Sequence, residues 1–251
     1  MSKRKRRKRL PEPVSGITIE SLSHDGRGVA HLDGKAVFID GALPGEVVSF
    51  EYRASRRRFD EGRVTAVAQA SPDRVQPGCP HFGLCGGCSL QHMEPAAQIR
   101  AKQQTLLDNL KHIGKVVPQD VLPALTGPVW GYRTKGRLGV KDVIKKGRVL
   151  VGFREKYSPY VADLAACEVL HPSIGKRIEE LAQLIGQLEG RARIPQIEVA
   201  VAGSITALVF RHLDPLSQGD LGRLKQYAME RQLHVYLQPA GPDSVQPLWP
   251  E

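Results

Sequence analysis

The chain has 251 residues, enough for a hydrophobic core and for two or more domains, because domains typically hold about 100–150 residues. Its 41% of hydrophobic and 25% of charged residues are ordinary proportions for a globular protein. No run of about 18 apolar residues occurs, and the basic start is not followed by the apolar segment of a secretory signal. We therefore expect a cytoplasmic protein with no membrane span.

The N-terminus carries a block of seven consecutive cations. The formal net charge is +10, and subtracting these seven leaves +3 for the rest of the chain. Such a block repels itself and cannot pack, so residues 1–13 are predicted to be a disordered arm that binds a polyanion, nucleic acid above all. A solubilising tail, an anionic membrane surface or a nuclear-import signal would also fit. The cations are Lys3, Arg4, Lys5, Arg6, Arg7, Lys8 and Arg9.

Residues 14–71 have the pattern of five short strands separated by glycine and proline turns, with no helix. Asp33-Gly34 is a strong signal for a hairpin turn. Closing a sheet of short strands removes its exposed edges, so a small closed barrel is predicted. Arg56, Arg57 and Arg58, followed by Phe59, lie between the fourth and fifth strands, where they could contact phosphates and bases or form a solvated hairpin tip.

Residues 72–93 form a loop rich in glycine, proline and cysteine. Its C-x5-C-x2-C spacing places Cys79, Cys85 and Cys88 close together, and Cys167 follows far downstream. Thiols of a cytosolic protein are expected to be reduced. Three clustered thiols and one distant thiol are typical of an iron–sulfur site more than of a zinc site, which usually pairs two short knuckles.

Two other interpretations of the cysteines stay open. In a zinc site, His81, His92 or His171 could replace one thiol. A redox-active pair of free thiols would leave two of the four cysteines without a role.

Residues 94–251 are predicted to form an antiparallel α+β domain. Its first helix places Ile99, Leu106, Leu110 and Ile113 on one stripe and ends near Gly114. After a proline-punctuated connection, a hairpin, two further helices and three strands follow, and the last residues look like a tail without structure. On the first strand of the hairpin, Arg133, Lys135 and Arg137 alternate on one face, as either polar surface or an extension of an RNA track.

Four stretches of this sequence resemble a known family. "CPHFGLCGGCSLQH" with "ACEVLHP", "SLSHDGRGVAHLDGKAVFIDGALPGEVV", "WGYRTKGRLGV" and "VGFREKYS" are similar to segments of the iron–sulfur-containing bacterial 23S rRNA (uracil-C5)-methyltransferases. The resemblance covers about residues 14–240 and implies a TRAM domain, which is a small OB-like barrel that binds RNA. It also implies S-adenosylmethionine (SAM) as methyl donor and a 4Fe-4S cluster. The implied cluster ligands are Cys79, Cys85, Cys88 and Cys167.

The sequence also departs from that family. The SAM-binding segments, the nucleophilic cysteine and the general-base glutamate that the family places after its central domain do not occur among these 251 residues. We therefore expect a monomeric chain that recognises ribosomal RNA and binds the cluster but does not methylate alone. The alternative is a stand-alone nucleic-acid-binding protein with a redox-sensing cluster. A radical methylthiotransferase is disfavoured, because it would need C-x3-C-x2-C and a carboxy-terminal TRAM domain.

Overall fold

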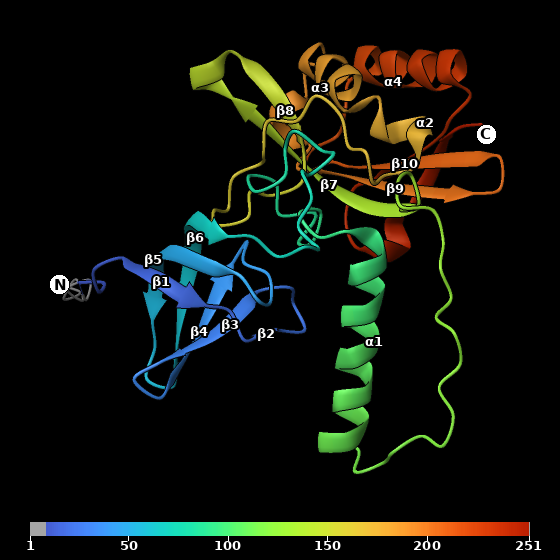
Figure 1. Cartoon of the computed structure of the whole chain (residues 1–251). Helices are drawn as coiled ribbons and strands as arrows, with labels where there is room; N and C mark the ends of the chain where they lie inside the picture. The colour runs from blue at the N-terminus through green and yellow to red at the C-terminus, as the bar shows by residue number, and fades with distance from the viewer. Residues whose placement is uncertain (1–8, 251) are drawn as a thin grey trace. The chain divides into compact units, whose positions relative to one another are not determined.

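The computed structural model describes residues 9–250, and these divide into two compact units (Figure 1). The first holds the described residues up to Pro80 together with Cys88–Thr126, and the second holds His81–Gly87 and the residues from Gly127 onward. Six cations of the N-terminal arm, Lys3, Arg4, Lys5, Arg6, Arg7 and Lys8, lie outside the described residues. None of the helices within residues 9–250 is long and apolar enough to cross a membrane.

The first unit contains a six-stranded sheet with the order β1-β5-β6-β4-β3-β2. All of its pairs are antiparallel except β4 with β6. The expected turn at Asp33-Gly34 is confirmed, and both residues adopt the positive φ that such a tight hairpin requires. The strands are β1 (Val14–Thr18), β2 (Ser21–Leu22), β3 (Gly28–Leu32), β4 (Lys35–Asp40), β5 (Val47–Ser55) and β6 (Phe59–Gln69).

The two outer strands of this sheet come from one stretch of chain. The sequence predicted a single first strand, whereas the structure divides it into β1 and β2, separated only by Ile19 and Glu20. The Ile19 amide donates to the Glu46 carbonyl, and the Glu20 amide donates to the Val29 carbonyl, both at 2.8 Å. One continuous segment therefore bonds to strands near both ends of the sheet.

The core of this sheet follows the alternation of its strands. Val37, Ile39, Val48 and Phe50 point inward and are at most 1% exposed. A second apolar cluster joins Leu43 to Met93 and Ala97, so the first turn of α1 (Pro95–His112) packs within the same unit. The sequence suggested that the central domain begins at residue 94, whereas the contacts group α1 with the sheet of the first unit.

Helix α1 is confirmed, but its apolar stripe is not buried. Glu94 caps the helix by accepting the Ala97 amide, and Pro95 occupies the first turn, where its missing N–H costs nothing. Ala97 is its only buried residue among those described, while Leu106 is 59% and Ile113 is 77% exposed. Helical periodicity therefore predicted the element correctly but not its surroundings.

The second unit has another six-stranded sheet, with the order β12-β11-β10-β9-β7-β8. Helices α3 and α4 lie along one side of it (Figure 1), and their apolar residues share its core, so the expected α+β class is confirmed. The sheet is not wholly antiparallel as predicted: β10 and β11 pair parallel, because α4 connects them as a crossover. The strands are β7 (Lys135–Val143), β8 (Arg148–Gly152), β9 (Gln196–Ala202), β10 (Ile205–Arg211), β11 (His234–Gln238) and β12 (Gln246–Trp249). The helices are α2 (Pro172–Gly175), α3 (Ile178–Gly186) and α4 (Gln218–Arg231), with short 3-10 turns η1 (Ile144–Lys146), η2 (Arg191–Arg193) and η3 (Pro242–Ser244).

Two expectations about the second unit were wrong in detail. The predicted amphipathic helix divides into α2 and α3, because the chain turns at Lys176 and Arg177. The supposed proline-rich tail contains β12, which pairs antiparallel with β11. Pro247 lies in this strand, and proline is tolerated there because β12 is at the edge of the sheet and needs no N–H on its outer side.

Candidate cysteine site and RNA-facing surfaces

All four cysteines are free thiols with partly buried side chains. The segment His81–Gly87 runs beside residues 154–156 of the second unit and is hydrogen-bonded to them. The Gly86 amide donates to the Arg154 carbonyl and the Lys156 amide donates to the Leu84 carbonyl, both at 2.8 Å. Cys85 pairs with Glu155 between these two bonds. The backbone around Cys85 is therefore fixed by the same hydrogen bonds that would join two strands.

Glycines allow this close approach. A Cβ on Gly86 would lie 3.0 Å from the Arg154 carbonyl oxygen. On Gly87 it would lie 3.4 Å from the Cys85 sulfur and 3.3 Å from the Phe153 ring. The Gly87 amide donates a hydrogen bond to the Cys85 Sγ at 3.4 Å. Glycine at position 87 therefore leaves room for a backbone amide to face the Cys85 sulfur.

Cys167 is held in the same unit as Cys85. Its amide donates to the Gly175 carbonyl at 2.7 Å, and a Cβ on Gly175 would overlap the Cys167 carbonyl oxygen. Cys85 and Cys167 both pack against the hydrophobic core of the second unit, as does Phe153. Two thiols that are 82 positions apart in the sequence thus rest on one core.

Cys79 and Cys88 belong to the first unit; Cys88 directly follows the segment His81–Gly87, and Pro80 separates Cys79 from it. The Cys79 amide donates to the Gln91 side chain at 3.2 Å. Across residues 9–250, no three His, Cys, Asp or Glu side chains form a group that could hold a metal ion.

Two histidines considered as zinc ligands have other roles in the fold. His81 Nε2 accepts the Ala165 amide at 3.3 Å, and the His171 side chain accepts the Ser173 amide at the start of α2. His92 is 3% exposed. One ring nitrogen of each of these two histidines therefore already accepts a hydrogen bond from the backbone.

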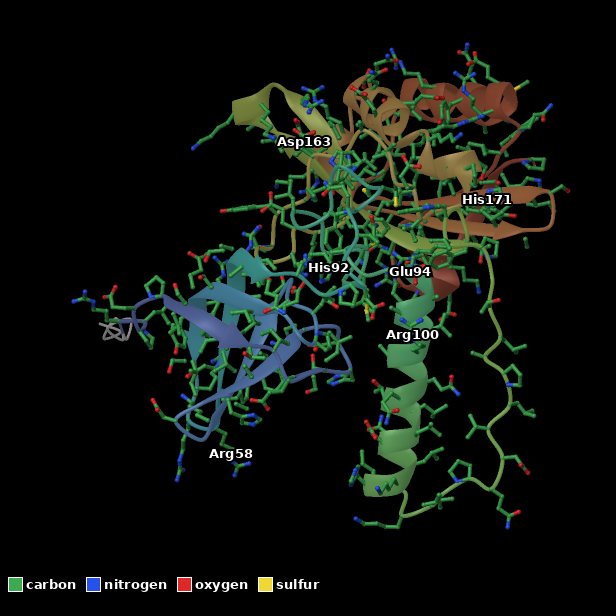
Figure 2. All side chains as sticks on the ribbon, viewed as in Figure 1. Arg58, His92, Glu94, Arg100, Asp163 and His171 are labelled. Atoms are coloured by element: carbon green, nitrogen blue, oxygen red, sulfur yellow. The ribbon has the colours of Figure 1, made fainter. Side chains whose placement is uncertain are left out.

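The arginine cluster lies on the turn between β5 and β6. Arg56, Arg57 and Arg58 are exposed, and Figure 2 shows Arg58 pointing away from the sheet. Phe59 begins β6 and contacts Phe38 edge to face, with ring centroids 5.6 Å apart.

Arg27 adds a cation that the sequence reasoning missed. Its guanidinium lies 4.9 Å from the Phe38 ring centroid. It directly precedes β3, far from the arginine cluster in sequence, and only the pairing of β3 with β4 brings it to the aromatic pair.

The row of three cations predicted on one face of the strand is interrupted at Arg133. Lys135 and Arg137 are exposed on the strand, and Arg137 forms an ion pair with Glu198 at 3.1 Å. Arg133 precedes the strand, is half-buried, and donates to the Gly87 carbonyl at 3.2 Å. It therefore does not share the surroundings of the other two. Among the cations of the N-terminal arm, Arg9 is described and pairs with Glu12 at 3.2 Å.

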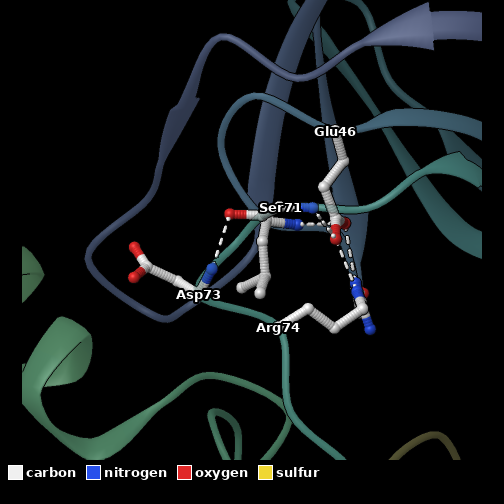
Figure 3. Close-up of polar contacts among 6 residues, drawn as sticks. Glu46, Ser71, Asp73 and Arg74 are labelled. Carbon is white, nitrogen blue, oxygen red and sulfur yellow. Dashed lines mark hydrogen bonds and ion pairs between the residues drawn. The ribbon is translucent and has the colours of Figure 1, made fainter.

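A buried ion pair joins the sheet of the first unit to the start of the cysteine loop (Figure 3). The Glu46 side chain is fully buried, and its carboxylate accepts bonds from the Arg74 guanidinium and from the amides of Leu43 and Ser71. Burial opposes ionisation, but these four donors outweigh it and hold the pKa of Glu46 below its ordinary value. No local sequence signal pointed to this pair.

Comparison with known proteins assigns part of the first unit to a known domain family. Residues 14–65 match the family model of the TRAM domain, so the chain contains a TRAM domain. The chain is also similar to curated proteins named 23S rRNA (uracil(1939)-C(5))-methyltransferase RlmD. That of Alcanivorax borkumensis is 52% identical over 98% of this chain and 56% of the relative. That of Nitrosococcus oceani is 53% identical over the whole chain and 56% of the relative.

The chain thus spans a little over half the length of these relatives. A solved structure shares the fold: the tRNA (uracil-54, C5)-methyltransferase of Pyrococcus abyssi in complex with S-adenosyl-L-homocysteine has a TM-score of 0.61 and 19% identity. The match covers 89% of this chain and 50% of that one.

Proposed function

We propose that this chain supplies the RNA-recognition and 4Fe-4S-binding portion of a SAM-dependent methyltransferase that acts on C5 of a uracil in ribosomal RNA. The observation that carries the proposal is the identity of more than 50% with the RlmD proteins along 98–100% of this chain. Identity that extends through both units means that the proposal concerns the whole chain and not the TRAM domain alone.

The RNA-binding role rests on the TRAM domain and on the arginines of its β5–β6 turn. Exposed guanidinium groups on a tight turn can reach phosphates without first breaking other contacts, and each neutralised phosphate releases counterions. The edge-to-face pair of Phe38 and Phe59 supplies a fixed aromatic surface beside that turn, of the kind on which bases stack. Lys135 and Arg137 of β7 are proposed as further RNA contacts.

The residues proposed to hold the cluster are Cys79, Cys85, Cys88 and Cys167. The chemistry of these donors suits such a cluster, because its usual ligands are cysteine thiolates and all four cysteines are free and partly buried. The amide bond to the Cys85 sulfur is the kind of contact that stabilises a metal-bound thiolate. When bound, the cluster would supply covalent iron–sulfur bonds between the loop and the segment of Cys167.

Methyl transfer itself is not proposed for these 251 residues. Methylation of uracil at C5 requires a thiolate that adds to C6, and then a base that removes the C5 proton. Every cysteine present is assigned to the cluster, so none remains as the nucleophile. Turnover of labelled SAM on unmodified 23S ribosomal RNA by this chain alone would contradict that assignment.

One protein preparation can test the cluster and the RNA-binding role independently. Protein purified without oxygen should be brown and contain about four irons per chain, whereas a colourless protein with one zinc would exclude the cluster. RNA affinity should be similar before and after oxidation. A large redox-dependent change would instead favour the redox-sensing alternative.

The arginine cluster gives a direct test of RNA binding. Replacing Arg57 and Arg58 by Gln should lower the slope of log affinity against log salt by about 0.7–0.9 for each lost phosphate contact. Titrating unmodified 23S ribosomal RNA at several salt concentrations measures this slope. Replacing the exposed cations Lys176 and Arg223 by Gln removes the same charge elsewhere and should change the slope little. Equal effects of the two double variants would show that only net charge matters.

A further inference from the structure

We infer that Arg133 is a positioning residue for the cysteine site and not a member of the RNA-binding surface. The inference rests on the proposed function, because it assigns Arg133 to the cluster ligands. The observation behind it is that this one residue contacts two segments that carry cysteines. Its neighbour in the predicted row of cations, Arg137, instead forms an ion pair with Glu198.

The side chain of Arg133 reaches the cysteine loop. Its guanidinium donates to the Gly87 carbonyl at 3.2 Å and lies 5.7 Å from the centroid of the Phe153 ring, within cation–π range. That carbonyl belongs to the peptide unit that joins Gly87 to Cys88. The bond therefore orients the peptide leading directly into the third thiol of the loop.

The backbone of Arg133 is fixed to the segment that follows Cys167. Its amide donates to the Val169 carbonyl at 2.9 Å, and its carbonyl accepts the His171 amide at 3.0 Å. Together these bonds form a parallel bridge between Arg133 and Leu170. Arg133 is thus anchored three residues beyond Cys167 while its side chain holds the loop of Cys85 and Cys88.

Phe153 completes the arrangement. Its ring packs against the core of the second unit and lies within contact range of a Cβ built on Gly87, which is also in range of the Cys85 sulfur. The guanidinium of Arg133 lies over this ring, so the ring and the Gly87 carbonyl together set the position of the cation. Lysine cannot reproduce this geometry, because it has neither the planar fork nor the stacking surface.

A cation at this position also suits the charge of the proposed group. Four thiolates bring more negative charge than the iron–sulfur core cancels, so a fixed guanidinium nearby stabilises the assembled site. An arginine used in this way is half-buried and committed to protein partners, as Arg133 is. An arginine that binds RNA is exposed, as Arg137 is, with 71% of its side chain accessible.

The test compares Arg133→Gln, Arg133→Lys and the control Arg137→Gln in the full chain purified without oxygen. Two quantities are measured: the rate at which the visible absorption disappears in air, and the salt dependence of affinity for unmodified 23S ribosomal RNA. Arg133→Gln should lose its cluster about tenfold faster, because a charge-assisted hydrogen bond is removed. Arg133→Lys should be intermediate. Arg137→Gln should keep the cluster lifetime and lower the slope of RNA binding.

The inference is overturned if Arg133→Gln keeps the wild-type cluster lifetime and weakens RNA binding as much as Arg137→Gln does. If the wild-type protein binds no iron, the cluster part of the proposed function fails, but the role of Arg133 can still be tested. Alkylation of Cys85 and Cys88, followed by mass spectrometry, should then be faster in Arg133→Gln than in the wild type. Equal alkylation rates would overturn the positioning role itself.

Discussion

At the scale of single residues, two contacts determine how the loop and the cysteines are held. Glu46 is buried with its carboxylate saturated by four donors, and Arg74 extends the network by donating to the Gly41 carbonyl at 2.7 Å. Gly175 allows the chain to pass against the backbone of Cys167. Glu46 and Arg74 are 28 positions apart in the sequence and Cys167 and Gly175 are eight apart. The first contact depends on the charge of Glu46, and the second depends on the missing side chain of Gly175.

The first prediction concerns Glu46→Gln. Removing the charge leaves Arg74 with a weaker partner, so the free energy of unfolding at pH 7 should fall by at least about 2 kcal/mol. The folded pKa of Glu46 is lowered, so its contribution is complete above the ordinary glutamate pKa of about 4.3 and is lost as the pH falls further. Denaturant titrations from pH 7 to 3 should show the difference between wild type and variant narrowing in acid.

Glu51→Gln is the matched control, because Glu51 lies on β5 of the same sheet with 47% of its side chain exposed. It should change stability by no more than about 0.5 kcal/mol. A gap between wild type and Glu46→Gln that stays constant down to pH 3 would contradict the role given to the ionised carboxylate.

The second prediction compares two glycine-to-alanine changes. Gly175→Ala would place a methyl group against the Cys167 carbonyl and should destabilise the second unit by about 1–3 kcal/mol. Gly186 ends α3 with no atom near its missing Cβ, so Gly186→Ala should be neutral or stabilising by up to about 1 kcal/mol. Thermal unfolding of both variants measures the difference. If Gly175→Ala unfolds at the same temperature as the wild type, the backbone at Cys167 can shift to make room for the added methyl group.

At the scale of elements, periodicity predicts helices well but does not say which face is covered. Helices α1 and α3 both carry a stripe of aliphatic residues. In α3 the stripe enters the core, with Ile178, Leu181 and Ile185 fully buried, whereas in α1 only Ala97 is buried among the residues described. The stabilising contribution of each stripe should therefore differ, although their sequence patterns are alike.

The third prediction uses one substitution in both helices. Leu181→Ala removes a fully buried side chain and should lower the free energy of unfolding by about 2–5 kcal/mol. Leu106→Ala changes a residue that is 59% exposed, and the loss should stay near 0.5 kcal/mol. Urea titrations give both values. Equal losses would show that the stripe of α1 is covered in solution.

At the scale of the whole molecule, the chain has two units with separate apolar cores. The core of the first is centred on residues such as Phe50, and that of the second on residues such as Phe210. Units with their own cores can unfold in separate transitions. Both tryptophans of the chain, Trp130 and Trp249, lie in the second unit, which makes their fluorescence a selective probe of it.

The fourth prediction follows from these two cores. Leu208→Ala should shift the unfolding transition observed by tryptophan fluorescence, because Leu208 is fully buried in the second unit. Val48→Ala, in the core of the first unit, should shift a transition seen by far-ultraviolet circular dichroism and leave the fluorescence transition in place. A single transition that both variants shift by equal amounts would show that the units unfold together.

The sequence by itself determined the features that depend on neighbouring residues. Asp33-Gly34 specified a hairpin because these residues tolerate positive φ, and apolar spacing specified α1, α3 and α4 because side chains on one helix face recur every three or four positions. The spacing of the cysteines directed attention to the loop at residues 72–93. These signals are local, so they can be detected without knowledge of the fold.

Only the tertiary structure decided which distant residues meet. It placed Arg133 against Gly87 and Phe153, which lie 46 positions earlier and 20 positions later in the sequence. It also separated Arg133 from Lys135 and Arg137, with which the alternating sequence pattern grouped it. It buried Glu46 against Arg74 and brought Cys85 and Cys167 onto one core. Such contacts arise from the packing of whole sheets, and no pattern within a short window of sequence encodes them.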